Sequence, residues 1–157
     1  MLWMTTAALA APSWTVQVDP LTTALGFVHV QIERGFDDWS VYAGPHVRLF
    51  DGLLTEGHEP YVGHGAESGV RWYPRGAAPA GPWLLVRGVL AHAVTTEGPR
   101  ETSWCGYGSG LGGGTLLLAD RWVLSGGLGV QYLAYGVAGY GTYGVAPAAH
   151  TAVGVAF

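Results

Sequence analysis

The residues of this chain that could carry chemistry are few, and the most conspicuous are a run of glycines. The letters GSGLGG at 108–113 match the spacing of a dinucleotide-binding loop, in which glycines let the backbone approach a pyrophosphate at the start of a helix. Here TLLL and a turn follow at 115–120, where no helix is expected. Because the chain holds 26 glycines, such a match arises by chance, and we predict no bound cofactor.

Three side chains, His64, Ser68 and His92, are of the types that a hydrolase uses as base and nucleophile. Ser68 lies four residues from His64, which is about 13 Å along a strand and too far for a direct proton transfer. We therefore predict no catalytic residue, and these three are the candidates only under the alternative of a lipid-modifying enzyme.

Metal and covalent chemistry find little support elsewhere in the chain. His58-Glu59 lacks the second histidine of a zinc-protease motif. Cys105 is the only cysteine, so neither an intrachain disulfide nor a cysteine-based zinc site can form. All seven basic residues are arginine, which excludes a lysine-containing phosphate loop and a lysine Schiff base. We predict no metal site.

Composition narrows the fold class. The 157 residues suffice for one domain, and they are 49% hydrophobic but only 11% charged. A glycine inside a helix costs about 1 kcal/mol relative to alanine, so this glycine-rich chain is a poor helix former. For the same reason we do not expect the uncharged stretch 122–149, which holds seven glycines, to cross a membrane as a helix. The net charge of −4 provides no basic surface for nucleic acid.

Alternation of apolar and polar residues, which is typical of half-buried strands, recurs along the chain. In 25–34, for example, valines and an isoleucine alternate with histidine, glutamine and glutamate. The predicted strands are 13–20, 25–34, 38–50, 61–73, 82–96, 103–118, 121–136 and 149–157. Whether 14–34 forms one strand or two stays open at this point, and 82–96 is apolar on both faces.

The connections between these strands alternate in length. Short turns are expected at 35–37, 74–81 and 119–120, and longer loops at 51–60, 97–102 and 137–148. Short turns on one side and longer loops on the other are typical of outer-membrane barrels. The pattern predicts an all-β fold, a single antiparallel up-and-down transmembrane β-barrel of about eight strands.

Aromatic residues gather at the strand ends that carry the short turns. They are Trp14, Trp39, Trp72, Trp83, Trp122 and Phe157. Indole rings prefer the zone where hydrocarbon meets hydrated headgroups, and membrane barrels carry aromatic girdles there. A soluble core would tend to place its tryptophans at mid-strand, so the pattern favours a girdle on the periplasmic side of a membrane barrel.

The polar face of the predicted strands concentrates the charged residues. It includes Glu33, Arg48, Glu67 and Arg71, together with His29 and His46. An eight-stranded barrel has an interior just wide enough for side chains to fill, so we expect this face to line the lumen. The glycines of 103–118 are expected to line it too. The two histidines would be hydrogen-bonded to the charged cluster, or would make the lumen sensitive to protonation.

Parts of the chain resemble bacterial families of small outer-membrane barrels of unknown function, of the OmpA- and OmpX-like eight-stranded type. Those families open with an Asn-Pro-Leu segment and a Tyr-Glu-Arg-like strand end, and carry a later Gly-Tyr-Arg-Tyr-Tyr-like strand. This chain has VDPL at 18–21, QIER at 31–34 and GVRWYP at 69–74, so that Asp19 replaces the asparagine and Ile32 the tyrosine. The letters TAVGVAF at 151–157 also resemble the C-terminal signal read by the outer-membrane insertion machinery. The resemblance implies an architecture and is nearly silent on activity.

The N-terminal segment 1–12, MLWMTTAALAAP, is uncharged and apolar. Its Ala8-Leu9-Ala10 fits a small-residue cleavage site, although the positively charged start of an export signal is missing. We interpret 1–12 as a signal peptide shortened at its start, followed by the barrel at 13–157.

These patterns predict a non-enzymatic protein of the outer membrane of a Gram-negative bacterium. It would have a filled polar lumen and a structural, envelope or loop-presenting role, or form a minor pore. Its partners would be outer-membrane lipids and lipopolysaccharide, and the insertion machinery through its final strand; we expect a monomer. The alternatives are a lipid A acyl hydrolase or acyltransferase and, further off, a soluble lipocalin-like carrier of an apolar ligand.

Overall fold

The computed structural model describes residues 12–51, 58–76 and 78–157. The predicted signal peptide, 1–12, lies outside the described residues except for Pro12. No helix in these ranges is long and apolar enough to cross a membrane.

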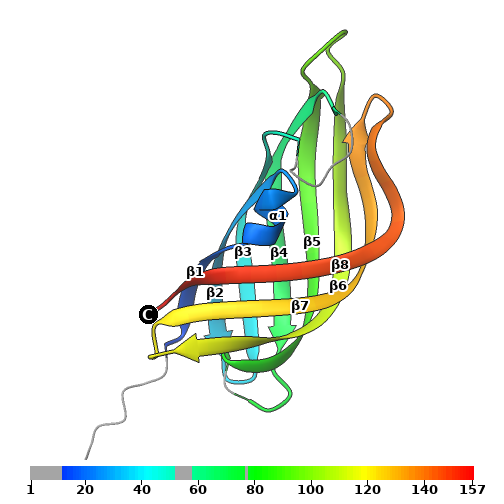
Figure 1. Ribbon diagram of the computed structural model, residues 1–157. Helices are drawn as coiled ribbons and strands as arrows, with labels where there is room; N and C mark the ends of the chain where they lie inside the picture. The colour runs from blue at the N-terminus through cyan, green and yellow to red at the C-terminus, as the bar shows by residue number, and fades with distance from the viewer. Residues whose placement is uncertain (1–11, 52–57, 77) are drawn as a thin grey trace, which may run out of the picture.

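Eight antiparallel strands form a closed barrel in which each strand pairs with the next along the chain and the last pairs with the first (Figure 1). The prediction of an all-β, up-and-down barrel of about eight strands is confirmed. The strands are β1 (Trp14–Val18), β2 (Phe27–Phe36), β3 (Trp39–Arg48), β4 (Tyr61–Trp72), β5 (Gly81–Thr95), β6 (Thr102–Leu118), β7 (Trp122–Val137) and β8 (Tyr140–Ala156). A short helix, α1 (Pro20–Ala24), lies between β1 and β2 in the chain.

The helix α1 decides how residues 14–34 are organised: they form two strands and not one. Asp19 has an extended backbone, and its side chain accepts hydrogen bonds from the amides of Leu21 and Thr22. Pro20 occupies the first turn of the helix. Both residue types are favoured at a helix start, because aspartate satisfies free amides there and proline has no amide to satisfy. The Asp-Pro step is therefore the local signal for this helix.

The loop expected at 137–148 is largely strand, so that prediction was wrong. Strands β7 and β8 are joined by Ala138 and Gly139 alone, with positive φ of 54° and 84°, as two-residue hairpin turns require. The glycines beyond the turn lie within strand β8, and those at close contacts let β7 and β8 approach each other. Gly141 pairs with Gly136 of β7, and a Cβ on Gly141 would lie 2.2 Å from the Tyr135 carbonyl oxygen.

Strand β6 is oriented differently from the expectation. Its even-numbered glycines face outward, whereas Tyr107 and Leu111 point inward. The register with β5 explains this, because Leu111 pairs with Leu85, and β5 turns Trp83, Leu85 and Arg87 inward. Since β5 is apolar on both faces, alternation along the sequence could not fix the orientation of this hairpin.

Side chains alternate between the inside and the outside of the barrel, and the inside holds the charges. Among the charged residues of the described strands, Arg34 alone faces outward, at the end with the short turns. The inward ones are Glu33, Arg48, Glu67, Arg71 and Arg87. The interior therefore holds charged side chains among buried aromatic and aliphatic ones, and a largely apolar wall encloses it.

Candidate functional site

The interior near the short turns is built around the carboxylate of Glu33, whose side chain is fully buried. Arg71, also fully buried, donates from Nη1 to Glu33 Oε2 at 2.7 Å. The same carboxylate accepts hydrogen bonds from Thr15, Gln17, Ser40 and Tyr73. A buried ion pair is tolerated only when additional hydrogen bonds satisfy its remaining polar atoms, and here five donors converge on two oxygens.

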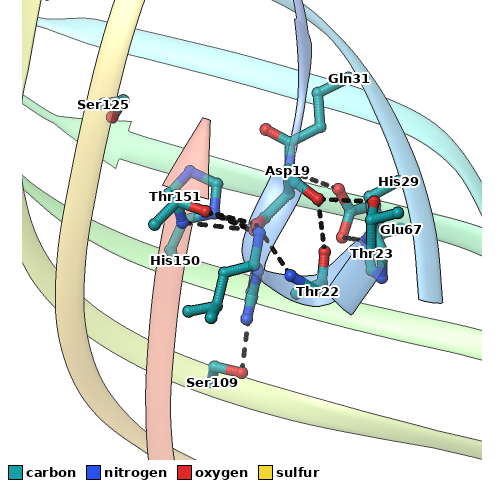
Figure 2. A network of polar contacts seen from close by, with 12 residues as sticks. Asp19, Thr22, Thr23, His29, Gln31, Glu67, Ser109, Ser125, His150 and Thr151 are labelled. Atoms are coloured by element: carbon teal, nitrogen blue, oxygen red, sulfur yellow. Dashed lines mark hydrogen bonds and ion pairs between the residues drawn. The ribbon is translucent and has the colours of Figure 1, made fainter. Parts of the chain in front are cut away.

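A second carboxylate, that of Asp19, joins α1 to β8 (Figure 2). Besides capping the helix, it accepts a hydrogen bond from the Thr151 hydroxyl at 2.7 Å, and its Oδ2 lies 3.2 Å from His150 Nδ1. His150 Nε2 lies 2.8 Å from Arg71 Nη2, so the Asp19 cluster is connected to that of Glu33. Buried polar contacts thereby fix α1 to the barrel wall.

In the middle of the barrel, a chain of hydrogen bonds runs from Glu67 through two histidines to Tyr135. Glu67 Oε2 lies 2.6 Å from His29 Nδ1, and His29 Nε2 lies 2.9 Å from His46 Nδ1. His46 Nε2 then lies 2.9 Å from the Tyr135 hydroxyl. Because an ionised carboxylate can only accept, neutral imidazoles satisfy the chain in one direction: each donates from Nδ1 toward Glu67, and Tyr135 donates to His46. In that arrangement both rings carry the proton on Nδ1.

At the end of the barrel with the longer connections, Arg48 is held from several sides. Its Nη2 lies 3.0 Å from Asp51 Oδ1 and 3.0 Å from Glu59 Oε2. The guanidinium also lies over the ring of Tyr61, 3.9 Å from its centroid, and donates to the Tyr61 carbonyl oxygen. The cation is thus fully occupied by groups of this chain.

A histidine outside the barrel ties two connections together. His58 contacts Asp51 Oδ2 through Nδ1 at 2.7 Å and Glu97 Oε1 through Nε2 at 3.0 Å. These two hydrogen bonds raise the pKa of His58, and the bond from His58 lowers the pKa of Asp51. The contact therefore links the connection after β3 to that after β5 most strongly when His58 is protonated and Asp51 is ionised.

Between the Glu67 chain and the loop end lies a cavity of about 400 Å³. Most of its lining is apolar, from Leu21, Leu25, Phe27, Leu133 and the tyrosines at 61, 107 and 135. Arg87 also lines it, with a side chain that is only 4% exposed. Its Nε donates to Ser109 Oγ at 3.4 Å, and its Nη1 has no hydrogen-bond partner.

The structure places all six predicted lumen residues inside the barrel, but in three groups. These groups are Glu33 with Arg71, Glu67 with His29 and His46, and Arg48 at the loop end. Asp19, which the alternation of its strand assigns to the polar face, also lies inside, and sequence reasoning left out three further interior residues: Arg87, Tyr135 and His150. His150 could have been found from its polar-face position, whereas Arg87 lies in the ambiguous strand and Tyr135 carries no distinguishing signal.

Five of the six predicted girdle residues lie exposed on the outer face at the end with the short turns: Trp14, Trp39, Trp72, Trp122 and Phe157.

Trp83 is the exception, and its assignment to the girdle was wrong. It is 1% exposed inside the barrel, and its Nε1 donates to Thr115 Oγ1 at 3.0 Å. Its six-membered ring fits against Gly113 and Gly127, where a Cβ would come within 2.5 Å and 2.3 Å of it. The missing side chains make room for the indole.

The three candidates for lipid-modifying catalysis lie on the outer face. His64 and His92 pair across β4 and β5, with ring centroids 5.6 Å apart. Ser68 lies further along β4 opposite Gly88, and no hydrogen bond within the described ranges joins it to either histidine. The arrangement offers no contact between nucleophile and base. In the same ranges, no three metal-ligating side chains converge.

Comparison of the chain with models of protein families, with curated proteins and with solved structures finds no match. Function is therefore inferred from the barrel wall and its interior.

Proposed function

We propose that this protein is a non-enzymatic integral β-barrel of a bacterial outer membrane, with its apolar face toward lipid and a closed polar interior. The observation that carries the proposal is the distribution of charge. In the described strands every charged side chain except Arg34 points into the barrel. A soluble barrel favours the reverse arrangement, because water solvates outward charges and apolar residues fill the core. Hydrocarbon does not solvate charged side chains, and a lipid environment therefore accounts for an outer face that is almost free of charge.

The apolar character of the outer face supports the same proposal. Large apolar side chains are exposed on all eight strands, and Trp104, Leu128 and Val145 are 71%, 73% and 79% exposed. Soluble monomers rarely expose contiguous apolar patches larger than a few hundred Å². Aromatic residues mark both ends of this face, with tryptophans near the short turns and Trp104 and Tyr143 near the loops, as interfacial belts do.

The filled interior supports a structural role over that of a pore. Arg71, Tyr73, Trp83 and Leu85 are each 2% exposed or less and occupy the half near the short turns. An eight-stranded barrel has just enough room for such side chains, whereas much larger barrels leave an aqueous channel. We therefore propose that the protein stabilises the envelope or presents its loops, and that solutes do not flow through it.

Two measurements test this proposal. The full chain, expressed in a Gram-negative host, is expected in the outer-membrane fraction and to change electrophoretic mobility on boiling. In planar bilayers it is expected to give no stepwise conductance. Recovery of the folded chain in a detergent-free soluble fraction would overturn the membrane assignment, and regular conductance steps would overturn the closed interior.

A further inference from the structure

We infer that the cavity in the loop-end half of the barrel binds a single-chain amphiphile with an anionic headgroup, such as a medium-chain carboxylate. The inference goes beyond the proposed function, because it rests on the lining of the cavity and not on where the barrel resides. The volume of about 400 Å³ lies within the range of small-molecule sites, roughly 300–1,000 Å³.

The anionic headgroup is assigned to Arg87. The other buried arginines, Arg48 and Arg71, have carboxylate oxygens at 3.0 Å and 2.7 Å, but Arg87 forms no ion pair with any described residue. The carboxylate of Glu67, one strand away, is engaged by His29 and by Gln31. A buried cation with an unused N–H is costly, and a carboxylate matches the geometry of a guanidinium.

The other charged groups and the histidine that line the cavity already have partners within the protein, so Arg87 is the anion site of the cavity. Arg48 and Glu59 both line the cavity, and they pair with each other at the mouth. His29, which also lines it, donates toward Glu67 in the hydrogen-bond chain described above. A ligand carboxylate at Arg87 would therefore meet a free donor without displacing any contact of the protein.

The hydrocarbon chain is assigned to the wall formed by α1. Strand β1 pairs with β8 only along Thr15–Val18, and beyond that point α1, in place of a strand, contacts part of the free edge of β8 (Figure 1). Leu21 and Leu25 from this segment line the cavity together with Phe27 and Leu133. A small hydrophilic anion would leave this apolar wall in contact with water, and an uncharged apolar ligand would leave Arg87 unpaired. An anionic amphiphile would both cover the apolar wall and pair with Arg87.

The test uses the full chain folded in phosphatidylcholine nanodiscs and titrated with carboxyl-labelled dodecanoate, followed by carbon NMR. We expect a saturable bound carboxyl resonance with one site per chain, and none with labelled acetate, which lacks the chain. The Arg87→Gln variant is expected to weaken binding by about tenfold or more, the effect of losing a hydrogen bond to a charged group. The control Arg121→Gln changes an exposed arginine in a turn and should bind like the parent.

A second variant keeps the inference testable if Arg87→Gln does not fold, as judged by mobility on boiling. Leu25→Trp fills the apolar part of the cavity and retains Arg87, and it should also abolish saturable binding. The inference is overturned if the parent shows no saturable resonance. It is equally overturned if a folded Arg87→Gln, or Leu25→Trp, binds dodecanoate like the parent. None of these outcomes depends on the membrane fraction in which the chain is found, so failure here is distinct from failure of the proposed function.

Discussion

The buried pair of Glu33 and Arg71 allows the sharpest test of the interior, through the variant Glu33→Gln. The substitution keeps the size of the side chain, removes its charge and replaces one acceptor oxygen by a donor. Arg71 stays fully buried but has no charged partner left, and its Nη2 still lies 2.8 Å from His150 Nε2. Its guanidinium is also confined by the rings of Tyr42 and Trp83, whose centroids lie 5.0 Å and 5.3 Å away. The cation therefore cannot turn toward water.

The expected magnitude follows from this confinement. Removing one partner of a buried ion pair typically costs about 3–5 kcal/mol, because the other charge is left uncompensated. Whole domains are stable by only about 5–15 kcal/mol, so the loss should be large. With a urea slope of about 2 kcal/mol per molar, a loss of 3 kcal/mol lowers the unfolding midpoint by roughly 1.5 M.

The assay is urea unfolding of the barrel in lipid vesicles, followed by tryptophan fluorescence. Glu101→Gln, an exposed carboxylate outside the barrel, is the matched control and should stay within about 0.5 kcal/mol of the parent. Adding Arg71→Met to Glu33→Gln should restore part of the stability, because the uncompensated cation is removed with it. An unchanged midpoint for Glu33→Gln would refute the burial of an ionised pair at this place.

Three further predictions concern the packing, the outer face and the loops. Gly127→Ala should destabilise the barrel by about 1–3 kcal/mol, because its Cβ would lie 2.3 Å from the Trp83 ring, whereas Gly110→Ala, which meets nothing within 4 Å, should leave the urea midpoint unchanged. Leu128→Arg on the outer face should cost about 2–4 kcal/mol of folding free energy in vesicles if it faces mid-bilayer, whereas Thr96→Arg in a loop should have little effect. In an NMR titration, His58 should show a raised pKa that falls toward its ordinary value in Glu97→Gln, since Asp51 and Glu97 are the two groups that raise it. The contribution of that bridge is full below the ordinary pKa of His58, as long as the two carboxylates stay ionised, and it is lost as the pH rises through the raised pKa. An unchanged His58 pKa in Glu97→Gln would show that the bridge does not form.

Alternation of apolar and polar residues with a period of two predicts much of the fold, because it assigns each residue of a strand to one face of the sheet. The interior positions of Glu33, Glu67 and Arg71 follow from it directly, as does the outer position of Trp122. It failed where both faces carry similar residues. Trp83 lies in such a strand and was placed outside, although the glycines at 113 and 127 leave space for it inside.

Local backbone signals explain the remaining differences. The Asp19-Pro20 step marks the start of α1, but periodicity over so short a helix is too weak to detect. Glycines at 139, 141 and 144 resemble a loop, whereas in the structure only Gly139 lies in the turn. The grouping of interior side chains depends in part on contacts across the barrel lumen, which no local pattern encodes. Tyr135 of β7 meets His46 of β3 in this way, whereas His29 and His46 are paired neighbours on β2 and β3.

The orientation of the wall is tested most directly by a nitroxide spin label at position 128, introduced through Leu128→Cys in a Cys105→Ser background with the barrel folded in lipid vesicles. Collisions with oxygen, which dissolves in hydrocarbon, are compared with collisions with a water-soluble nickel complex, and a label at Thr96 serves as the reference for water exposure. We predict frequent collisions with oxygen and almost none with nickel at position 128. Collisions with nickel as frequent as those at position 96 would contradict a wall that faces lipid.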